Sequence, residues 1–301
     1  MLESSVKKSS PVLLIDASIY IFQYYFALPD HWFSEDEQWP TAAVYGYTAF
    51  LIRLLKTQQP KRIAACFDES LDQCFRNEIY ADYKCSRALP DEALAFQLKA
   101  CKQVTKLLGI SRYASARYEA DDLLGCLYQR CKRSASPIAI LTRDKDLGQL
   151  LQRPQDFLWD HAKDQRSYDD DIKNKFGVHP EQLIDYLALV GDSVDDIPGV
   201  PGIGKKTAQQ LLQHFGSIQG LFKQLDDIEK LPIRGAKRMT ENLRNYREQI
   251  GIAQQLATIV TDLPIISSIH EINKQPVDSQ RLEKFCFRMG FPKLQKTIIG
   301  L

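Results

Sequence analysis

The stretch Tyr118-Glu119-Ala120-Asp121-Asp122-Leu123-Leu124 places three carboxylates within four residues. It stands where apolar residues begin to recur at helical spacing, so we expect its acids to occupy the first turn of an amphipathic helix. Acidic residues in a first turn ordinarily complement the helix dipole, and for this stretch alone that interpretation stays open. Its meaning therefore depends on where the other carboxylates of the chain fall.

Carboxylates also follow short apolar runs that are typical of buried strands. Val12–Ile15 is followed by Asp16, Ile63–Phe67 by Asp68, and the run at 137–142 by Asp144 and Asp146. These runs alternate with helical patterns, which predicts an α/β fold with a mostly parallel central sheet flanked by helices. Since the carboxyl ends of parallel strands meet at one edge of the sheet, we expect these acids to lie together.

So many carboxylates in one cleft repel one another unless protons or cations neutralise them. A lone Asp at a strand end is more often a turn or cap residue, so the prediction rests on the whole set. Divalent cations that prefer oxygen ligands, Mg²⁺ or Mn²⁺, would neutralise this many carboxylates. The set therefore indicates a two-metal phosphodiester hydrolase. The predicted metal ligands are Asp16, Asp68, Glu119, Asp121, Asp122, Asp144, Asp146, Asp192 and Asp195.

The segment 75–87 interleaves aromatic residues with cations and has no clear helical or strand period. Such a composition suits contact with phosphates together with stacking on bases, as nucleic-acid-binding proteins use it. An ordinary solvated loop has the same composition, and the residues alone do not decide between the two.

Strand signals fade from Asp169 on and helix signals dominate, and we expect residues 1–178 to form the catalytic core and 179–301 a helical C-terminal part. The turn Gly199–Thr207 nearly matches a phosphate-binding loop, but Lys206 stands where Ser or Thr is required and no strand precedes it. A helix-hairpin-helix turn fits better, because Gly202 and Gly204 permit a tight turn and the next helix N-terminus offers N–H groups to a phosphate. A plain glycine-rich turn is the alternative.

The 301 residues carry a formal net charge of +1, a balance that neither supports nor excludes a nucleic-acid partner. Seven dispersed cysteines without a CxxC pair indicate reduced thiols in a cytoplasmic protein. Residues 1–10 lack the apolar region of a signal peptide, and no apolar run approaches membrane-spanning length. We therefore expect no membrane association.

Taken together, these residues resemble the 5′-nuclease family of flap endonucleases and 5′→3′ exonucleases. The likeness is closest to the bacterial branch, which includes the N-terminal nuclease domain of DNA polymerase I, and it runs from about Val12 to the C-terminus. The motifs that carry it are Leu14-Ile15-Asp16, Phe67-Asp68, Phe75-Arg76, Tyr83-Lys84 with Arg87, the 118–122 stretch, Thr142-x-Asp144-Lys145-Asp146, Gly191-Asp192-x-x-Asp195, and the 199–208 turn. No polymerase domain follows, which makes the chain resemble a free-standing member.

The resemblance implies a PIN-like core with a helical arch at about 69–118 and a helix-three-turn-helix module at about 190–260. It implies that the 5′ single strand passes the segment Asp72–Arg87. The first metal would be held or oriented by Asp16, Asp68, Glu119 and Asp121, and the second by Asp144, Asp146, Asp192 and Asp195, with Asp121 and Asp122 near both.

The resemblance also assigns DNA contacts. Lys84 and Arg87 would grip the scissile phosphate as catalytic residues, Tyr83 would stack on a base, and Arg76 would contact DNA. The turn would bind the duplex backbone, and often a K⁺ ion, through Gly202, Gly204, Lys205, Lys206 and Thr207. The implied substrate is DNA with a 5′ flap, 5′ overhang or free 5′ end, or an RNA primer in a hybrid, bound by a monomer.

Two residues depart from the family pattern. Gln23 stands where bacterial members usually carry arginine, and Asp196 where asparagine is typical, which adds negative charge near the expected DNA path. Two other functions therefore stay open: a structure-specific DNA-binding protein with impaired turnover, and an RNase of the related PIN-like type.

Overall fold

A computed structural model of the chain describes residues 10–36, 38–70, 73–233 and 235–297. Its centre is a six-stranded sheet with the order β3-β2-β1-β4-β5-β6, in which β6 is antiparallel to β5 and all the other neighbours are parallel. The strands are β1 (Val12–Asp16), β2 (Ile63–Asp68), β3 (Ser111–Ser115), β4 (Ile138–Leu141), β5 (Phe157–Asp160) and β6 (Gln165–Ser167). The predicted mostly parallel α/β fold is confirmed.

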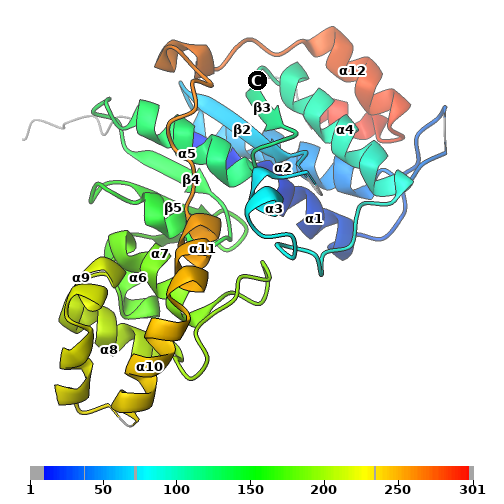
Figure 1. Cartoon of the computed structure of the whole chain (residues 1–301). Coiled ribbons are helices and arrows are strands. Elements are labelled where there is room, and N and C mark those ends of the chain that lie inside the picture. The colour runs from blue at the N-terminus through cyan, green and yellow to red at the C-terminus, as the bar shows by residue number, and fades with distance from the viewer. Residues whose placement is uncertain (1–9, 37, 71–72, 234, 298–301) are drawn as a thin grey trace, which may run out of the picture.

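Helices cover both faces of this sheet, and the alternation of side chains in β1 shows why. Val12 and Leu14 join the core on one face, while Leu13 and Ile15 join the core on the other. The second face is covered by α1 (Ala17–Ala27), α2 (Ala42–Gln58), α4 (Glu92–Leu107) and α12 (Ser279–Arg288). The first is covered by α5 (Ala120–Cys131), so the body has three layers (Figure 1).

The C-terminal helices form a group beyond one end of the sheet (Figure 1). They are α6 (Asp169–Phe176), α7 (Leu183–Val190), α8 (Lys205–Phe215), α9 (Ile218–Lys223), α10 (Ala236–Asn245) and α11 (Arg247–Ala257). After α11 the chain returns to the sheet body, where the Lys274 and Gln275 N–H groups donate to the carbonyls of Lys61 and Gly109. The last helix, α12, therefore belongs to the body, although we expected all of 179–301 to form the helical part.

The segment expected to form an arch divides between the core and the surface. Within 69–118, α4 packs on α2, and β3 is a strand of the sheet that its polar sequence hid from the strand prediction. Outside the core layers stand the short helix α3 (Phe75–Ile79) and the turns at 80–87 (Figure 1). Asp72, where the strand-passing segment was expected to begin, lies outside the described residues.

Candidate metal and nucleic-acid site

The carboxyl ends of β1, β2 and β4 bring acidic residues to one edge of the sheet. Asp16 ends β1 and Asp68 ends β2, the neighbouring parallel strand. Thr142, directly after β4, donates its hydroxyl to Asp16 Oδ2 at 2.9 Å. Asp68 Oδ1 accepts the backbone N–H of Ala120 at 2.8 Å, which fixes the start of α5 against the strand ends. The first turn of α5 thus adds its own acids to this edge.

These acids line a cleft of about 350 Å³. Eight of the nine predicted metal ligands lie on its wall, together with the two predicted catalytic cations and two further basic residues. The charged lining residues are Asp16, Asp68, Glu119, Asp121, Asp144, Asp146, Asp192, Asp195, Lys84, Arg87, Arg143 and Lys145. The sequence prediction that these distant acids share one site agrees with this arrangement.

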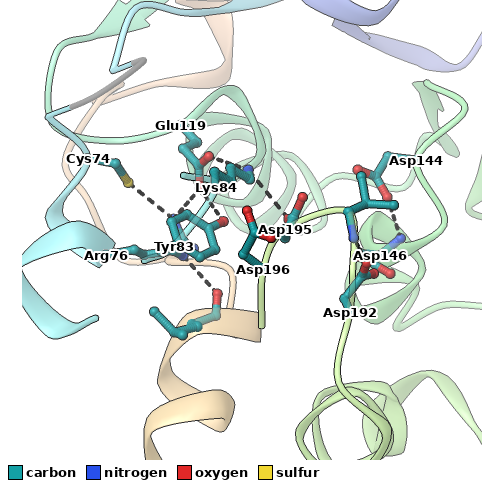
Figure 2. A network of polar contacts seen from close by, with 12 residues as sticks. Cys74, Arg76, Tyr83, Lys84, Glu119, Asp144, Asp146, Asp192, Asp195 and Asp196 are labelled. Atoms are coloured by element: carbon teal, nitrogen blue, oxygen red, sulfur yellow. Dashed lines mark hydrogen bonds and ion pairs between the residues drawn. The ribbon is translucent and has the colours of Figure 1, made fainter. Parts of the chain in front are cut away.

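Cationic side chains neutralise one part of the acidic set (Figure 2). Lys84 Nζ forms a short ion pair with Glu119 and lies 3.4 Å from Asp195 Oδ2. Arg87 reaches the other oxygen of Asp195 at 2.5 Å. Lys145 Nζ donates to Asp192 Oδ2 at 2.8 Å, and this interaction holds the pKa of Asp192 below its usual value although burial alone would raise it.

The remaining acids are crowded. Burial, then the charge of Asp68, raises the pKa of Asp16 to about 7. Burial, then the charge of Asp144, raises the pKa of Asp146 to about 7 and that of Asp121 well above its usual value. Like charges forced together in a buried cleft favour any partner that brings positive charge.

The donor set fits divalent cations, because it consists of hard carboxylate oxygens at one sheet edge. Asp146 Oδ1 is buried without a hydrogen bond, although Lys145 Nζ lies 3.3 Å away. In the described part of the chain, no three His, Cys, Asp or Glu side chains are already arranged around a common cation position. Lys84 Nζ lies between Glu119 and Asp195, and Lys145 Nζ between Asp146 and Asp192, so an ammonium group now occupies each of these two positions.

Asp122 does not line the cleft, and the prediction that it is a metal ligand is corrected here. Its side chain is fully buried, and its oxygens accept two hydrogen bonds from Arg76 at 2.7 and 2.8 Å and one from the Val260 N–H at 2.9 Å. Asp122 also accepts the N–H of Glu119. These contacts use the carboxylate to hold α5 against the chain that follows α11.

Arg76 is likewise withdrawn from the predicted DNA contacts, because only 2 % of its surface is exposed. It donates to Glu119, which lies beside it in Figure 2. It also binds Asp122 and donates to the carbonyls of Leu256 and Thr258. The guanidinium therefore joins α3, the start of α5 and the end of α11.

Tyr83 does not present a ring for base stacking, because it is 4 % exposed. Its hydroxyl donates to Glu119 Oε2 at 2.9 Å. Lys84 and Arg87 are its neighbours in the same turns, and both line the cleft as predicted. The buried side chains of Arg76 and Tyr83 thus anchor the segment 75–87, and Lys84 and Arg87 at its end reach the cleft.

The glycine-rich turn lies at the start of α8. Gly202 has φ +84°, a conformation that suits glycine, and Gly204 is the N-cap of α8. Lys205 and Lys206 are exposed in the first turn, Thr207 is half-buried, and Asn242 Nδ2 donates to the Pro201 carbonyl at 2.9 Å. The turn is therefore exposed and supported from α10, as an interhelical binding turn requires.

Besides the predicted acids, Lys84 and Arg87, the cleft is lined by residues that the sequence did not assign to a site. Lys145 stands between the predicted ligands Asp144 and Asp146, and this position in the sequence could have identified it as a cleft residue. Phe22 lines the cleft from α1, and no sequence motif contains it. The two departures are also placed: Gln23 Oε1 is buried and makes no hydrogen bond with a described residue. Asp196 bonds Ser86 and does not line the cleft.

Comparison with protein families gives two matches that cover most of the chain. Residues 11–177 match the N-terminal, resolvase-like domain of 5′-3′ exonucleases, and residues 178–280 match their C-terminal SAM fold. A 5′-3′ exonuclease of Buchnera aphidicola (subspecies Schizaphis graminum) is 33 % identical over 282 residues, which are 93 % of this chain and 94 % of that protein. The chain belongs to the 5′-3′ exonuclease family. The family and the nuclease class predicted from the motifs are confirmed.

Members of the 5′-3′ exonuclease family also occur within larger proteins. DNA polymerase I of Pseudomonas aeruginosa is 38 % identical over 274 residues, which are 90 % of this chain but 29 % of the polymerase. The chain thus spans under a third of that relative.

Solved structures support the fold. T5 5′-exonuclease with bound divalent metal ions (zinc) has a TM-score of 0.64 at 19 % identity and covers 96 % of this chain and 97 % of its own. The catalytic core of Rad2 in complex with DNA substrate has a TM-score of 0.64 at 17 % identity, with 97 % and 92 % covered. Within the described residues, no helix has the length and apolar character needed to cross a membrane.

Proposed function

We propose that this chain is a divalent-metal-dependent, structure-selective nuclease that hydrolyses phosphodiester bonds at 5′ ends and flaps of DNA. Mg²⁺ or Mn²⁺, two per active site, are the proposed cofactors. The proposed substrates are DNA with a 5′ flap, a 5′ overhang or a free 5′ end, and an RNA primer in a hybrid. We further propose that it acts as a monomer in the cytoplasm.

One observation carries this proposal: eight acidic side chains and two cations of the arch segment line a single cleft at the carboxyl edge of the sheet. Asp16, Asp68, Glu119 and Asp121, from the ends of β1 and β2 and the start of α5, would hold or orient the first ion. Asp144, Asp146, Asp192 and Asp195 would hold the second. Bound there, the ions would supply the positive charge that polarises a phosphodiester and activates water.

The chain's own residues bind and orient the substrate. Lys84 and Arg87 are the cations that reach the cleft from the surface turns, so they would contact the scissile phosphate and offset its developing charge. Both now pair with Asp195, and an entering phosphate offers them another anionic partner. Asp16, Glu119 and Asp192 are buried, which strengthens the charge interactions that these three acids make.

The exposed turn at Gly202–Thr207 would contact the duplex backbone at a distance from the cleft. Its glycines allow close approach of a phosphate, and the N-terminus of α8 with Lys205 and Lys206 supplies positive charge. Contacts of this kind position DNA without reading its sequence, in keeping with selectivity for structure. A K⁺ ion at this turn is part of the proposal.

The test uses a 5′-flap duplex labelled at either end, incubated with Mg²⁺, Mn²⁺ or EDTA. We expect metal-dependent release of the flap, its loss in Asp146→Ala, and strong slowing in Lys84→Ala. Lys284→Ala changes an exposed lysine of α12 and serves as the matched control, with cleavage at the unaltered rate.

Two outcomes would replace this function. Tight binding of flapped DNA without cleavage under any metal would favour the impaired DNA-binding protein. Faster cleavage of single-stranded RNA than of any DNA junction would favour the PIN-like RNase.

A further inference from the structure

Two loops from distant parts of the chain are joined at the mouth of the cleft. The cationic loop comprises residues 82–87 and the acidic loop residues 191–196. The Lys84 N–H donates to the Asp195 carbonyl at 3.1 Å, and both the Ser86 N–H and its hydroxyl donate to Asp196 Oδ2, at 2.9 and 2.7 Å. Arg87 adds the ion pair with Asp195. We name the contacts between Ser86 and Asp196 the clasp.

The backbone supports the clasp from both sides. Asp196 has φ +53° and Lys84 φ +54°, left-handed conformations that are uncommon for residues other than glycine. Aspartate tolerates this region better than most residues, so Asp196 combines the required backbone with a side-chain acceptor. In the cationic loop the N–H groups of Cys85 and Arg87 donate within the loop and form consecutive turns, whereas the Lys84 N–H donates to the acidic loop.

We propose that Asp196 is a positioning residue that holds the cationic loop so that Lys84 and Arg87 face the scissile phosphate. This deepens the proposed nuclease function and rests on it. Ser86 lies between the two cations, so fixing its N–H and hydroxyl fixes the backbone from which both long side chains extend. Asp196 does not line the cleft, and it acts through its contacts with the cationic loop, of which the hydrogen bonds from Ser86 are the main ones.

The clasp reverses what the sequence suggests for Asp196. A negative charge near the DNA path predicts weaker DNA binding, but this carboxylate is turned toward two donors of the cationic loop. Misplacement of catalytic groups by about 1 Å costs on the order of 100-fold in rate. Losing Asp196 should therefore slow the chemical step rather than improve affinity.

The first test compares Asp196→Gly with Asp196→Asn. Glycine accepts the left-handed backbone but removes the acceptor, whereas asparagine keeps both. We expect Asp196→Gly to lower the single-turnover cleavage rate at saturating flap substrate by about tenfold or more, with affinity for the flap in Ca²⁺ changed by less than about threefold. Asp196→Asn should restore most of the rate.

Asp164→Gly is the matched control, since Asp164 is another left-handed aspartate (φ +49°) in an exposed turn outside the cleft. Its cleavage rate should equal that of the unaltered protein. An unaltered rate in Asp196→Gly would overturn the proposal. Equal losses in Asp196→Gly and Asp196→Asn, or a loss confined to affinity, would overturn it as well.

Cys85 supplies a readout that does not depend on cleavage. It lies within the cationic loop and is exposed, whereas the other six cysteines are buried. Both Asp196 variants remove the charge beside Cys85, so a difference in its rate of maleimide labelling reports the loss of the side-chain contacts that residue 196 makes with the cationic loop, and not the loss of charge. We expect several-fold faster labelling in Asp196→Gly than in Asp196→Asn.

These readouts separate two failures. If the unaltered protein releases no flap with any metal, the proposed function fails, while the labelling difference still tests the clasp. If it releases the flap and the two variants label at equal rates, the nuclease function stands and the clasp is overturned.

Discussion

Two sets of carboxylates, in the cleft and directly behind it, differ in how their charge is compensated. The paired set forms ion pairs with Arg76, Lys84, Arg87 or Lys145, and its members are Glu119, Asp122, Asp192 and Asp195. The crowded set has pKa values raised by burial and by neighbouring carboxylates, and its members are Asp16, Asp68, Asp121 and Asp146. Asp146 belongs here because its pKa is raised although Lys145 Nζ lies 3.3 Å away. The paired set comes from the start of α5 and the loop after α7, whereas Asp16 and Asp68 of the crowded set end strands β1 and β2.

The difference shows that the same residue type serves opposite purposes within one site. The paired set stabilises the metal-free fold, because each charge has its partner within the chain. The crowded set destabilises that fold, and under the proposed function its charge would bind cations from solution. Substitutions in the two sets should therefore change stability in opposite directions.

The largest expected effect is on activity, in the crowded set. Asp121→Asn keeps the shape of the side chain but removes a charge that would hold metal, so flap cleavage should fall on the order of 1000-fold. In EDTA the same variant should unfold at a higher urea concentration than the unaltered protein, because one source of repulsion is gone. A variant that loses both cleavage and metal-free stability would place Asp121 in the paired set.

The next effect is on stability, in the paired set. Asp122→Ala leaves Arg76 buried without its main counter-charge, and the free energy of unfolding should fall by about 3–5 kcal/mol. Urea denaturation measures it. Asp170→Ala, the same change at an exposed position in the first turn of α6, should shift stability by no more than about 0.5 kcal/mol. A similar small shift in Asp122→Ala would show that the Arg76 pair contributes little.

The sequence predicted the crowded set well because it follows from chain order. Apolar runs ending in Asp16 and Asp68 predict parallel strands, and parallel strands end at one edge whatever the details of packing. The misassignment of Asp122 could have been avoided from helix geometry. Successive residues of a helix point in different directions, so Asp121 and Asp122 do not share a face.

The burial of Arg76 and Tyr83 could not be predicted from the residues around them in the sequence. Cations interleaved with aromatics are typical of both a nucleic-acid surface and an anchored turn. What decides between them is the contact of Arg76 with the Leu256 carbonyl, 180 residues away. The same holds for Asp196, whose partner Ser86 is 110 residues away.

The crowded set also predicts how stability depends on pH. For Asp16 and Asp146 the folded pKa of about 7 lies above the ordinary value of 3.8, so the folded protein binds more protons than the unfolded chain between these values. Stability without metal should therefore fall as pH rises from about 4 to about 7, by about 2 kcal/mol or more.

Under the proposed function Mg²⁺ would bind the folded, ionised site and oppose this loss, so that the stability difference between Mg²⁺ and EDTA widens over the same pH range. Urea midpoints measured at both ends of the range in each condition test this. Parallel curves in Mg²⁺ and EDTA would mean that the ions do not engage the crowded set.

The smallest effect distinguishes an anchoring role for Tyr83 from the base-stacking role that its sequence context suggests. Tyr83→Phe keeps the ring and removes only the hydroxyl that donates to Glu119, a neighbour of the crowded set in the cleft. We expect stability to fall by about 1 kcal/mol and DNA affinity in Ca²⁺ to stay unchanged.

Tyr83→Leu removes the ring as well and would disturb packing, yet a ring that is 4 % exposed has no face to offer a base. Affinity for a flap should therefore not depend on whether the base at the junction stacks strongly or weakly, and a loss in Tyr83→Leu that tracks base identity would restore the stacking role.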